Sequence, residues 1–178
     1  MKVGNRLVAS ILTGVVGTLL VLWLETGEVG FAKEKSPFSV EILPSQNAIQ
    51  AGIPMWKAGA PIFLIVKMTN HSQRVLHFAF TNPAFNYRVR VLDTSGQQVP
   101  ETENLRKMRE GLRNGLDAGR NILIEVKPGG TCQDGIEVSF LYDVSKPGEY
   151  FVQVERDMPP ELGKGVTTSN KIRATVTE

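Results

Sequence analysis

Apolar and polar residues alternate along most of the chain from Phe38 onward, in short runs separated by glycine, proline, asparagine and aspartate. Phe38, Val40 and Ile42, for example, alternate with Ser39 and Glu41. A period of two places successive side chains on opposite faces of an extended chain, so each run predicts a β-strand with one buried face. The other apolar faces predicted in this way are Ile62, Leu64, Val66 and Met68; Leu76, Phe78 and Phe80; Tyr87, Val89 and Val91; Ile122, Ile124 and Val126; Ile136, Val138 and Phe140; Tyr150, Val152 and Val154; and Ile172, Ala174 and Val176.

Turn-forming residues fill the gaps between these runs. They occupy positions 93–96 (Asp-Thr-Ser-Gly), 128–130 (Pro-Gly-Gly) and 146–148 (Lys-Pro-Gly), and each combination suits a tight turn. Roughly eight short strands at such spacing, with no helices between most of them, are typical of two antiparallel sheets packed as a sandwich. We therefore predict an all-β fold, and the pattern excludes a parallel α/β sheet.

One segment has helical spacing instead. Residues 102–116 carry apolar side chains three or four positions apart, namely Leu105, Met108, Leu112 and Leu116. This spacing predicts a helix, although each of its two internal glycines costs about 1 kcal/mol relative to alanine. We expect a short helix or ordered loop that is inserted between strands and lies over one end of the sandwich.

The first 32 residues have the order of an export signal. Lys2 and Arg6 precede an apolar stretch at residues 7–24, and the small residues Gly30 and Ala32 follow it. This order predicts a signal peptide cleaved after Ala32.

The apolar stretch also approaches the length of about 20 residues that crosses a bilayer, so an uncleaved N-terminal anchor helix is the alternative. In both cases the basic N-terminus stays in the cytoplasm and residues 33–178 are exported to the periplasm, cell surface or medium. Contact with the membrane is expected only through residues 7–24, and only if the leader is kept.

Composition narrows the possible partners. Lys and Arg total 20 against 18 for Asp and Glu, which gives a net charge of +2 over 178 residues. So small a charge does not predict binding to nucleic acid. Cys132 is the only cysteine, so it is either an inert small residue or the site of an intermolecular disulfide.

Catalytic and metal-binding patterns are absent from the sequence. The two histidines, His71 and His77, have no metal-ligand spacing, and neither lies beside an obvious serine nucleophile. Gly163, Lys164 and Gly165 lack the spacing of a phosphate-binding loop. We therefore predict no enzyme activity, no cofactor and no metal.

Two features are candidates for binding a partner. Arg106, Lys107, Arg109 and Arg113 cluster on the predicted helix, where they form either a docking face for an acidic partner or an ordinary solvated surface. Trp56 lies in a segment predicted to be a loop before the Ile62 strand, where it either anchors an interface or caps the core.

Residues 142–154 resemble the corner and penultimate strand of immunoglobulin-like domains. Tyr150 stands two positions before Val152, and Val152 takes the place of the cysteine that antibody domains carry. The resemblance implies a tyrosine corner, in which the Tyr150 hydroxyl bonds back to the backbone and has a structural role.

The earlier half is similar to the bacterial intracellular proteinase inhibitor-like domains, which are small β-sandwiches. The similarity rests on Val66, Asn70, Ser72, Leu76, Phe78 and residues 87–91 and 93–96. The combined pattern is also similar to that of secreted bacterial proteins with one such sandwich behind a leader.

From these features we expect residues 33–178 to be a non-enzymatic exported domain that docks on another envelope protein or on an acidic surface polymer. The alternative, implied by the resemblance alone, is a proteinase inhibitor that acts through an exposed loop.

Overall fold

The computed structural model describes residues 36–45, 49–50, 53–115 and 122–178. The predicted leader at residues 1–32, with both of its alternatives, lies outside these residues. Within the described ranges no helix is both long and apolar enough to cross a membrane. Residues 36–178 belong to one unit, which is mostly β-structure arranged in several antiparallel sheets.

The first sheet has three strands in the order β1-β4-β8, and both pairings are antiparallel. They are β1 (Phe38–Pro44), β4 (Phe63–Asn70) and β8 (Thr131–Glu137). Every second residue of β1 and β4 is buried, from Phe38 to Ile42 and from Leu64 to Asn70. The alternation read from the sequence therefore predicted both the strands and their buried face.

The second sheet is built around the longest strand, β9 (Gly148–Asp157). One edge of β9 pairs with β6 (Arg88–Leu92), and the other pairs with β10 (Val166–Thr168) and β11 (Ile172–Thr177), all antiparallel. Beyond β11 lie β3 (Ile53–Lys57) and the short β2 (Ile49–Gln50). The pairing of β3 with β11 is parallel and departs from the predicted antiparallel pattern.

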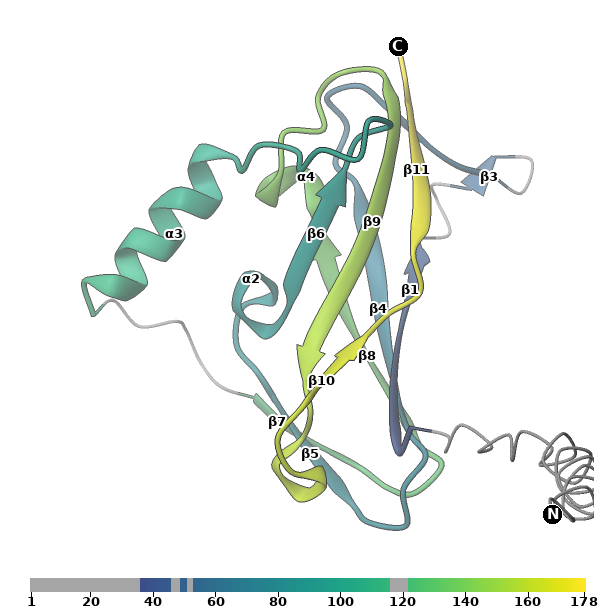
Figure 1. The fold of residues 1–178 in the computed structure, drawn as a ribbon, viewed down its shortest axis with the longest axis vertical. Coiled ribbons are helices and arrows are strands. Elements are labelled where there is room, and N and C mark those ends of the chain that lie inside the picture. Colours follow the sequence, from purple (N-terminus) through teal and green to yellow (C-terminus); the bar gives the residue numbers. More distant parts are fainter. Residues whose placement is uncertain (1–35, 46–48, 51–52, 116–121) are drawn as a thin grey trace, which may run out of the picture. The chain divides into compact units, whose positions relative to one another are not determined.

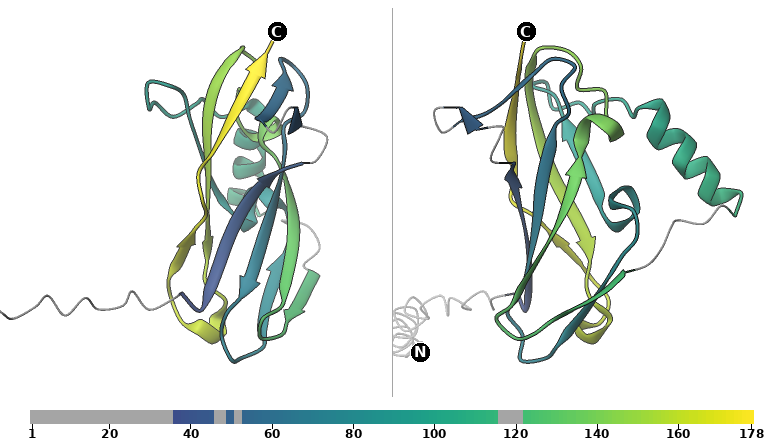
Figure 2. Two further views of the ribbon diagram at one scale, coloured as in Figure 1. Left: turned by 90° about the vertical axis from the view of Figure 1, so that its right-hand side faces the viewer. Right: turned by 180° about the vertical axis from the view of Figure 1, so that it is seen from behind.

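The core lies between these two sheets, which Figure 2 shows from the side. One buried cluster takes Ile42 and Val66 from the first sheet and Val152, Val154 and Ala174 from the second. Asn170 ties the sheets together, because its side chain accepts a hydrogen bond from Ile42 N (2.8 Å) and donates one to Ile42 O (3.1 Å). Apolar burial of this extent is the main stabilising contribution in a domain with a single cysteine.

A third, two-stranded sheet pairs β5 (Leu76–Phe80) with β7 (Ile122–Val126). Leu76, Phe78 and Phe80 are buried as predicted. The predicted burial of Ile122 is wrong, because its side chain is 59% exposed at the beginning of a strand that pairs with β5 alone.

Four short or isolated helical segments complete the described chain: α2 (Pro83–Asn86), α3 (Glu103–Arg113), α4 (Val138–Leu141) and the 3₁₀ turn η2 (Pro160–Leu162). The predicted strand through Phe140 is wrong in its second half, because β8 ends at Glu137 and the chain turns into α4. Val138 and Leu141 are buried at helical spacing, which leaves Phe140 41% exposed.

The turn before β9 has the hydrogen bond that the tyrosine corner implies. The Tyr150 hydroxyl donates to Lys146 O over 2.8 Å, four residues earlier in the chain. Gly148, with a φ of 155°, lies between them. The bond fixes the entry of the chain into β9, so the structural role expected for Tyr150 is present.

Candidate functional site

Helix α3 extends away from the strands (Figure 1). It begins after Thr102, whose side-chain oxygen accepts a hydrogen bond from Leu105 N (3.3 Å) and donates one to Phe140 O (2.5 Å). The hydroxyl therefore caps the helix and also attaches it to α4. The predicted insertion at 102–116 is confirmed as a helix over Glu103–Arg113, and Leu116 lies outside the described residues. The expected position over one end of the sandwich is wrong, because α3 contacts α4 and extends away from the strands (Figure 1).

The apolar side of α3 is only partly covered. Leu105 is buried at 2% exposure, Met108 is half-buried, and Leu112 is 37% exposed. Burial thus declines along the helix as it leaves the body of the protein. An isolated helix of this length is marginal in water, so the cap and Leu105 are what hold α3 in place.

Arg106, Arg109 and Arg113 follow one another at intervals of three and four residues and so share one face of α3, and Leu112, three residues after Arg109, borders this face. We call these four residues the α3 ridge. A small hollow on this face is lined by the three arginines together with Glu101 and Glu110. The ridge therefore combines three guanidinium groups with one apolar side chain.

Ion pairs within the domain already neutralise part of the positive charge of α3. Arg106 lies 2.7 Å from Glu103, and Arg109 lies 2.5 Å from Glu101. Lys107 is on another side of the helix, 3.9 Å from Glu103. Arg113 forms no ion pair with any residue that the structure describes. Exposed pairs of this kind contribute little stability, so they can exchange for a partner's carboxylates.

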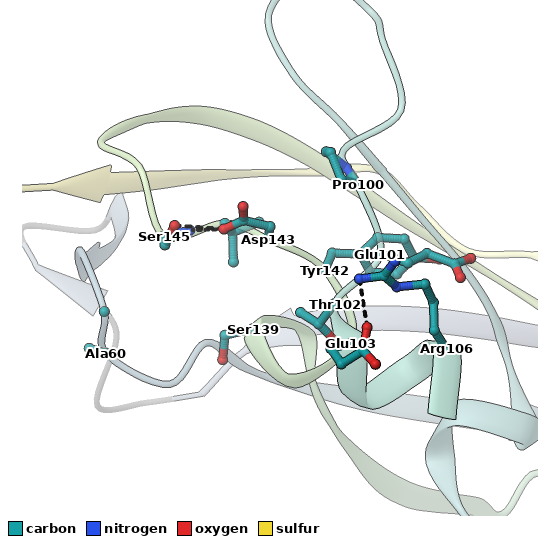
Figure 3. Close-up of a pocket in the computed structure, with 12 residues that line it drawn as sticks. Ala60, Pro100, Glu101, Thr102, Glu103, Arg106, Ser139, Tyr142, Asp143 and Ser145 are labelled. Carbon is teal, nitrogen blue, oxygen red and sulfur yellow. Dashed lines mark hydrogen bonds and ion pairs between the residues drawn. The ribbon is translucent and has the colours of Figure 1, made fainter. Parts of the chain in front are cut away.

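A larger hollow of about 530 Å³ lies at the base of α3 (Figure 3). We call it the root hollow; its lining residues are Gly59, Ala60, Pro100, Glu101, Thr102, Glu103, Arg106, Ser139, Tyr142, Asp143, Val144 and Ser145. Figure 3 shows Arg106 turned back toward Glu103, with Asp143 and Ser145 on the far side.

The root hollow is acidic, in contrast to the ridge. It contains the guanidinium of Arg106 and three carboxylates, of which Glu101 and Glu103 form the ion pairs given above and Asp143 forms none with a described residue. The Ser145 hydroxyl donates to Asp143 over 2.6 Å, and this bond together with a backbone N–H lowers the pKa of Asp143. Asp143 is therefore ionised at neutral pH, and opposite charges lie side by side at the base of the helix.

Trp56 is not part of this surface. The prediction that it lies in a loop is wrong, because it belongs to β3 and its indole is 7% exposed within the core cluster. Of the two roles considered for Trp56, the structure supports the core role, since a buried indole presents little surface to a partner.

The two histidines are placed apart by the fold. His71 lies 2.8 Å from the Ser39 hydroxyl, whereas His77 lies between Glu161 (2.5 Å) and Glu125 (3.5 Å). The hydrogen bond with Glu161 raises the pKa of His77.

Cys132 is half-buried in β8, and burial raises the pKa of its thiol. In the described ranges no three His, Cys, Asp or Glu side chains gather as a metal site would require.

Sequence reasoning missed Arg156, the one arginine that the described structure buries. It continues the inward positions Tyr150, Val152 and Val154 of β9. The alternation of β9 could have revealed it, because Arg156 occupies the next inward position after Val154.

No protein-family model matches the chain, and no curated protein matches it.

Proposed function

We propose that this chain is an exported, non-enzymatic binding domain that docks an acidic protein on the α3 ridge. The observation that carries the proposal is that α3 stands away from the strands with Leu112 and Arg113 open to solvent. A surface helix of a globular protein normally turns its apolar stripe toward the core. On α3 that stripe is progressively exposed, so part of it is available to another molecule.

The chemistry of the ridge favours a protein partner. Arginine is enriched among the residues that dominate binding energy, and a neighbouring apolar side chain helps to exclude water from its contacts. Leu112 next to Arg109 and Arg113 provides this combination. A polyanionic surface polymer would use the arginines but would gain nothing from Leu112, so the ridge suits an acidic protein surface with an apolar centre.

The acidic root hollow would favour one orientation of the partner on the ridge. Negative charge at the base and positive charge along the ridge would attract one arrangement of a partner's charges and repel its reverse. Complementary charges of this kind contribute to orientation and association rate more than to affinity. The partner is expected to place its carboxylates along the outer part of α3.

The proposed fold is an immunoglobulin-like sandwich behind a leader that directs export. Two facing sheets and the hydrogen bond from Tyr150 to Lys146 O support this architecture. In such domains the loops and insertions between strands commonly carry recognition while the sheets provide a rigid support. The position of α3 between β6 and β7 agrees with that division.

The test is photo-crosslinking in cells, with a photoreactive residue at Leu112 of the full-length chain. We expect one defined adduct, which is lost when Arg106→Glu, Arg109→Glu and Arg113→Glu are combined. Arg113→Glu alone should weaken the adduct without breaking an ion pair between described residues.

The matched control changes three exposed lysines away from α3, as Lys127→Glu, Lys164→Glu and Lys171→Glu, which alters the net charge by the same amount. It should leave the adduct intact. Equal loss in both variants would show a nonspecific charge effect, and no adduct from Leu112 would refute the ridge as a docking surface.

A further inference from the structure

Arg156 places a positive charge inside the domain. The side chain extends from the inward face of β9 and is only 7% exposed. Arginine is rarely buried to this degree unless a partner of opposite charge accompanies it. The neighbouring strand β6 offers a contrast, since Arg88 is exposed there and lies 2.9 Å from Asp157.

Aromatic rings surround the guanidinium of Arg156. Its central carbon lies 4.9 Å from the ring centroid of Phe80, 5.0 Å from that of Tyr87 and 5.5 Å from that of Phe78. Such cation–π contacts stabilise a desolvated cation. One polar contact is also present, because Nη2 donates to Ala79 O over 2.9 Å.

These contacts leave the charge incompletely balanced. Nη1 of Arg156 is buried and has no hydrogen-bond partner in the described structure. No carboxylate of a described residue forms an ion pair with it: its sequence neighbours Glu155 and Asp157 pair with Arg88, and Asp134 accepts a hydrogen bond from the Tyr87 hydroxyl instead. A buried cation with an unused donor is costly, so this position favours an added acceptor with negative charge.

A hollow of about 240 Å³, separate from the root hollow, is lined in part by Arg156. Besides Arg156 its walls include Phe85, Met158, Pro159 and Pro160. The space lies between α2, β5 and the end of β9, away from α3. It has room for a small group with an apolar part, and it is below the size usual for larger ligands.

We propose that this hollow is a binding site for a carboxylate, whose oxygen accepts a hydrogen bond from Nη1 of Arg156. A single negative charge matches the single unpaired cation. A dianion such as phosphate would need a second free cation, whereas His77, which also lines the hollow, is already held by Glu161 and Glu125, and the dianion would meet Asp157 there. A planar carboxylate with a short alkyl stem fits both the guanidinium and the apolar walls.

Because Nη1 is covered by protein atoms, the carboxylate reaches it only when a wall side chain moves aside. Met158 is suited to this, since it is half-buried and methionine is flexible and adapts to irregular spaces. The proposal is independent of the α3 ridge, so either can fail without the other. The carboxylate can belong to a free short-chain acid or to an acidic side chain of a peptide.

The test is nuclear magnetic resonance of the full-length chain labelled with ¹⁵N-arginine, titrated with propionate against sodium chloride of equal ionic strength. We expect saturable shifts of the Arg156 side-chain signals with a Kd on the order of 1 mM, and a rise in melting temperature. A second titration uses acetyl-Ala-Glu-Ala-amide, with the Gln peptide as its control. Binding of propionate alone identifies a free acid, and binding of the Glu peptide identifies an acidic side chain.

Variants complete the test. Arg156→Met should remove the propionate-dependent rise in melting temperature while leaving a folded domain, because an apolar residue of similar length replaces a buried charge. Arg90→Gln, an exposed arginine on β6, should keep the full rise. The proposal is overturned if neither titration shifts the Arg156 signals of the unmodified chain, or if Arg156→Met responds to propionate as the unmodified chain does.

Discussion

The interior between the sheets and the helix α3 use their apolar residues in opposite ways. On β1, β4 and β9 nearly every inward side chain is buried, as Phe38 (0% exposed) and Val66 (0%) illustrate. On α3 only Leu105 reaches this degree of burial, and Leu112 is 37% exposed. Burial is therefore concentrated in the sheets, whereas the outer part of α3 is left available for the docking proposed above.

The difference arises from the surroundings and not from the residue types. A strand in a paired sheet has a covered face along its whole length, whereas α3 meets the body only near its first turn, at Thr102 and Leu105. Beyond that turn the helix has few neighbours to bury its apolar side. Substitutions in the core should therefore cost far more stability than substitutions on α3.

Phe38→Ala should cause the largest loss. The side chain is fully buried and its ring centroid lies 5.3 Å from that of Phe78, so its removal leaves a cavity in the core. We expect the free energy of unfolding to fall by about 3–5 kcal/mol, measured by urea denaturation. Phe63→Ala on β4 is the matched control, because Phe63 is 46% exposed and should cost far less.

Asn70→Ala should lower the free energy of unfolding by roughly 2–3 kcal/mol. This fully buried amide donates to Arg74 O (2.7 Å) and Val126 O (2.9 Å) and accepts from Ser72 N (2.9 Å). Its loss would leave buried backbone groups unpaired at the end of β4. Ser72→Ala removes one side of the same network and should cost less; an equal cost would mean that Asn70 is not its centre.

Tyr150→Phe should lower the free energy of unfolding by about 1 kcal/mol, because it removes the bond to Lys146 O and keeps the ring. Equilibrium denaturation measures the change, and Tyr142→Phe gives a comparison. The Tyr142 hydroxyl donates to Val89 O over 2.6 Å in the same region. No effect from Tyr150→Phe would contradict the role of the corner in fixing β9.

Leu105→Ala should cost less than about 1 kcal/mol of global stability although Leu105 is as buried as a core residue. The reason is that α3 can detach locally without opening the sheets. Hydrogen exchange should become much faster for the α3 amides and remain unchanged for β4 and β9. Faster exchange throughout the sheets would show that α3 is an integral part of the core.

His77→Gln should have the smallest effect, visible in the pH dependence of stability. Hydrogen bonding to Glu161 raises the pKa of His77 above its ordinary value of 6.5, so its contribution is full below that value and is lost as pH rises through the folded pKa. The melting temperature should fall slightly as pH rises above 6.5 and through the raised pKa of His77, and the variant should lack this slope. An identical slope in both proteins would assign it to other groups.

Much of the β-structure follows directly from the alternation of side chains. The strands β1, β4, β5, β6, β9 and β11 were all predicted at their observed places. The parallel pairing of β3 with β11 was not, because β3 is short and begins next to Pro54, and a pairing between distant segments leaves no local pattern. The turn into α4 was missed because Val138 fits the strand alternation with Phe140 as well as the helical spacing with Leu141 over so few residues.

The candidate sites were predicted less completely. The basic residues of α3 follow from helical spacing, but the ion pair of Arg109 with Glu101 depends on the path of the chain before the helix. Trp56 was misplaced because the sequence gives no strong strand signal around it. Arg156 could have been found by continuing the period of β9, although the rings that surround it come from β5 and the start of β6.

The most direct test of the central claim replaces residues 103–115 of the full-length chain with a Gly/Ser linker of equal length. The melting temperature of cooperative unfolding should change by only a few degrees, because α3 is held mainly by Leu105 and the Thr102 cap. Adducts with the partner should disappear, with the photoreactive residue moved to position 101 in both the altered and the unaltered chain. Loss of folding would contradict the division between sheets and helix, and retained adducts would contradict docking on α3.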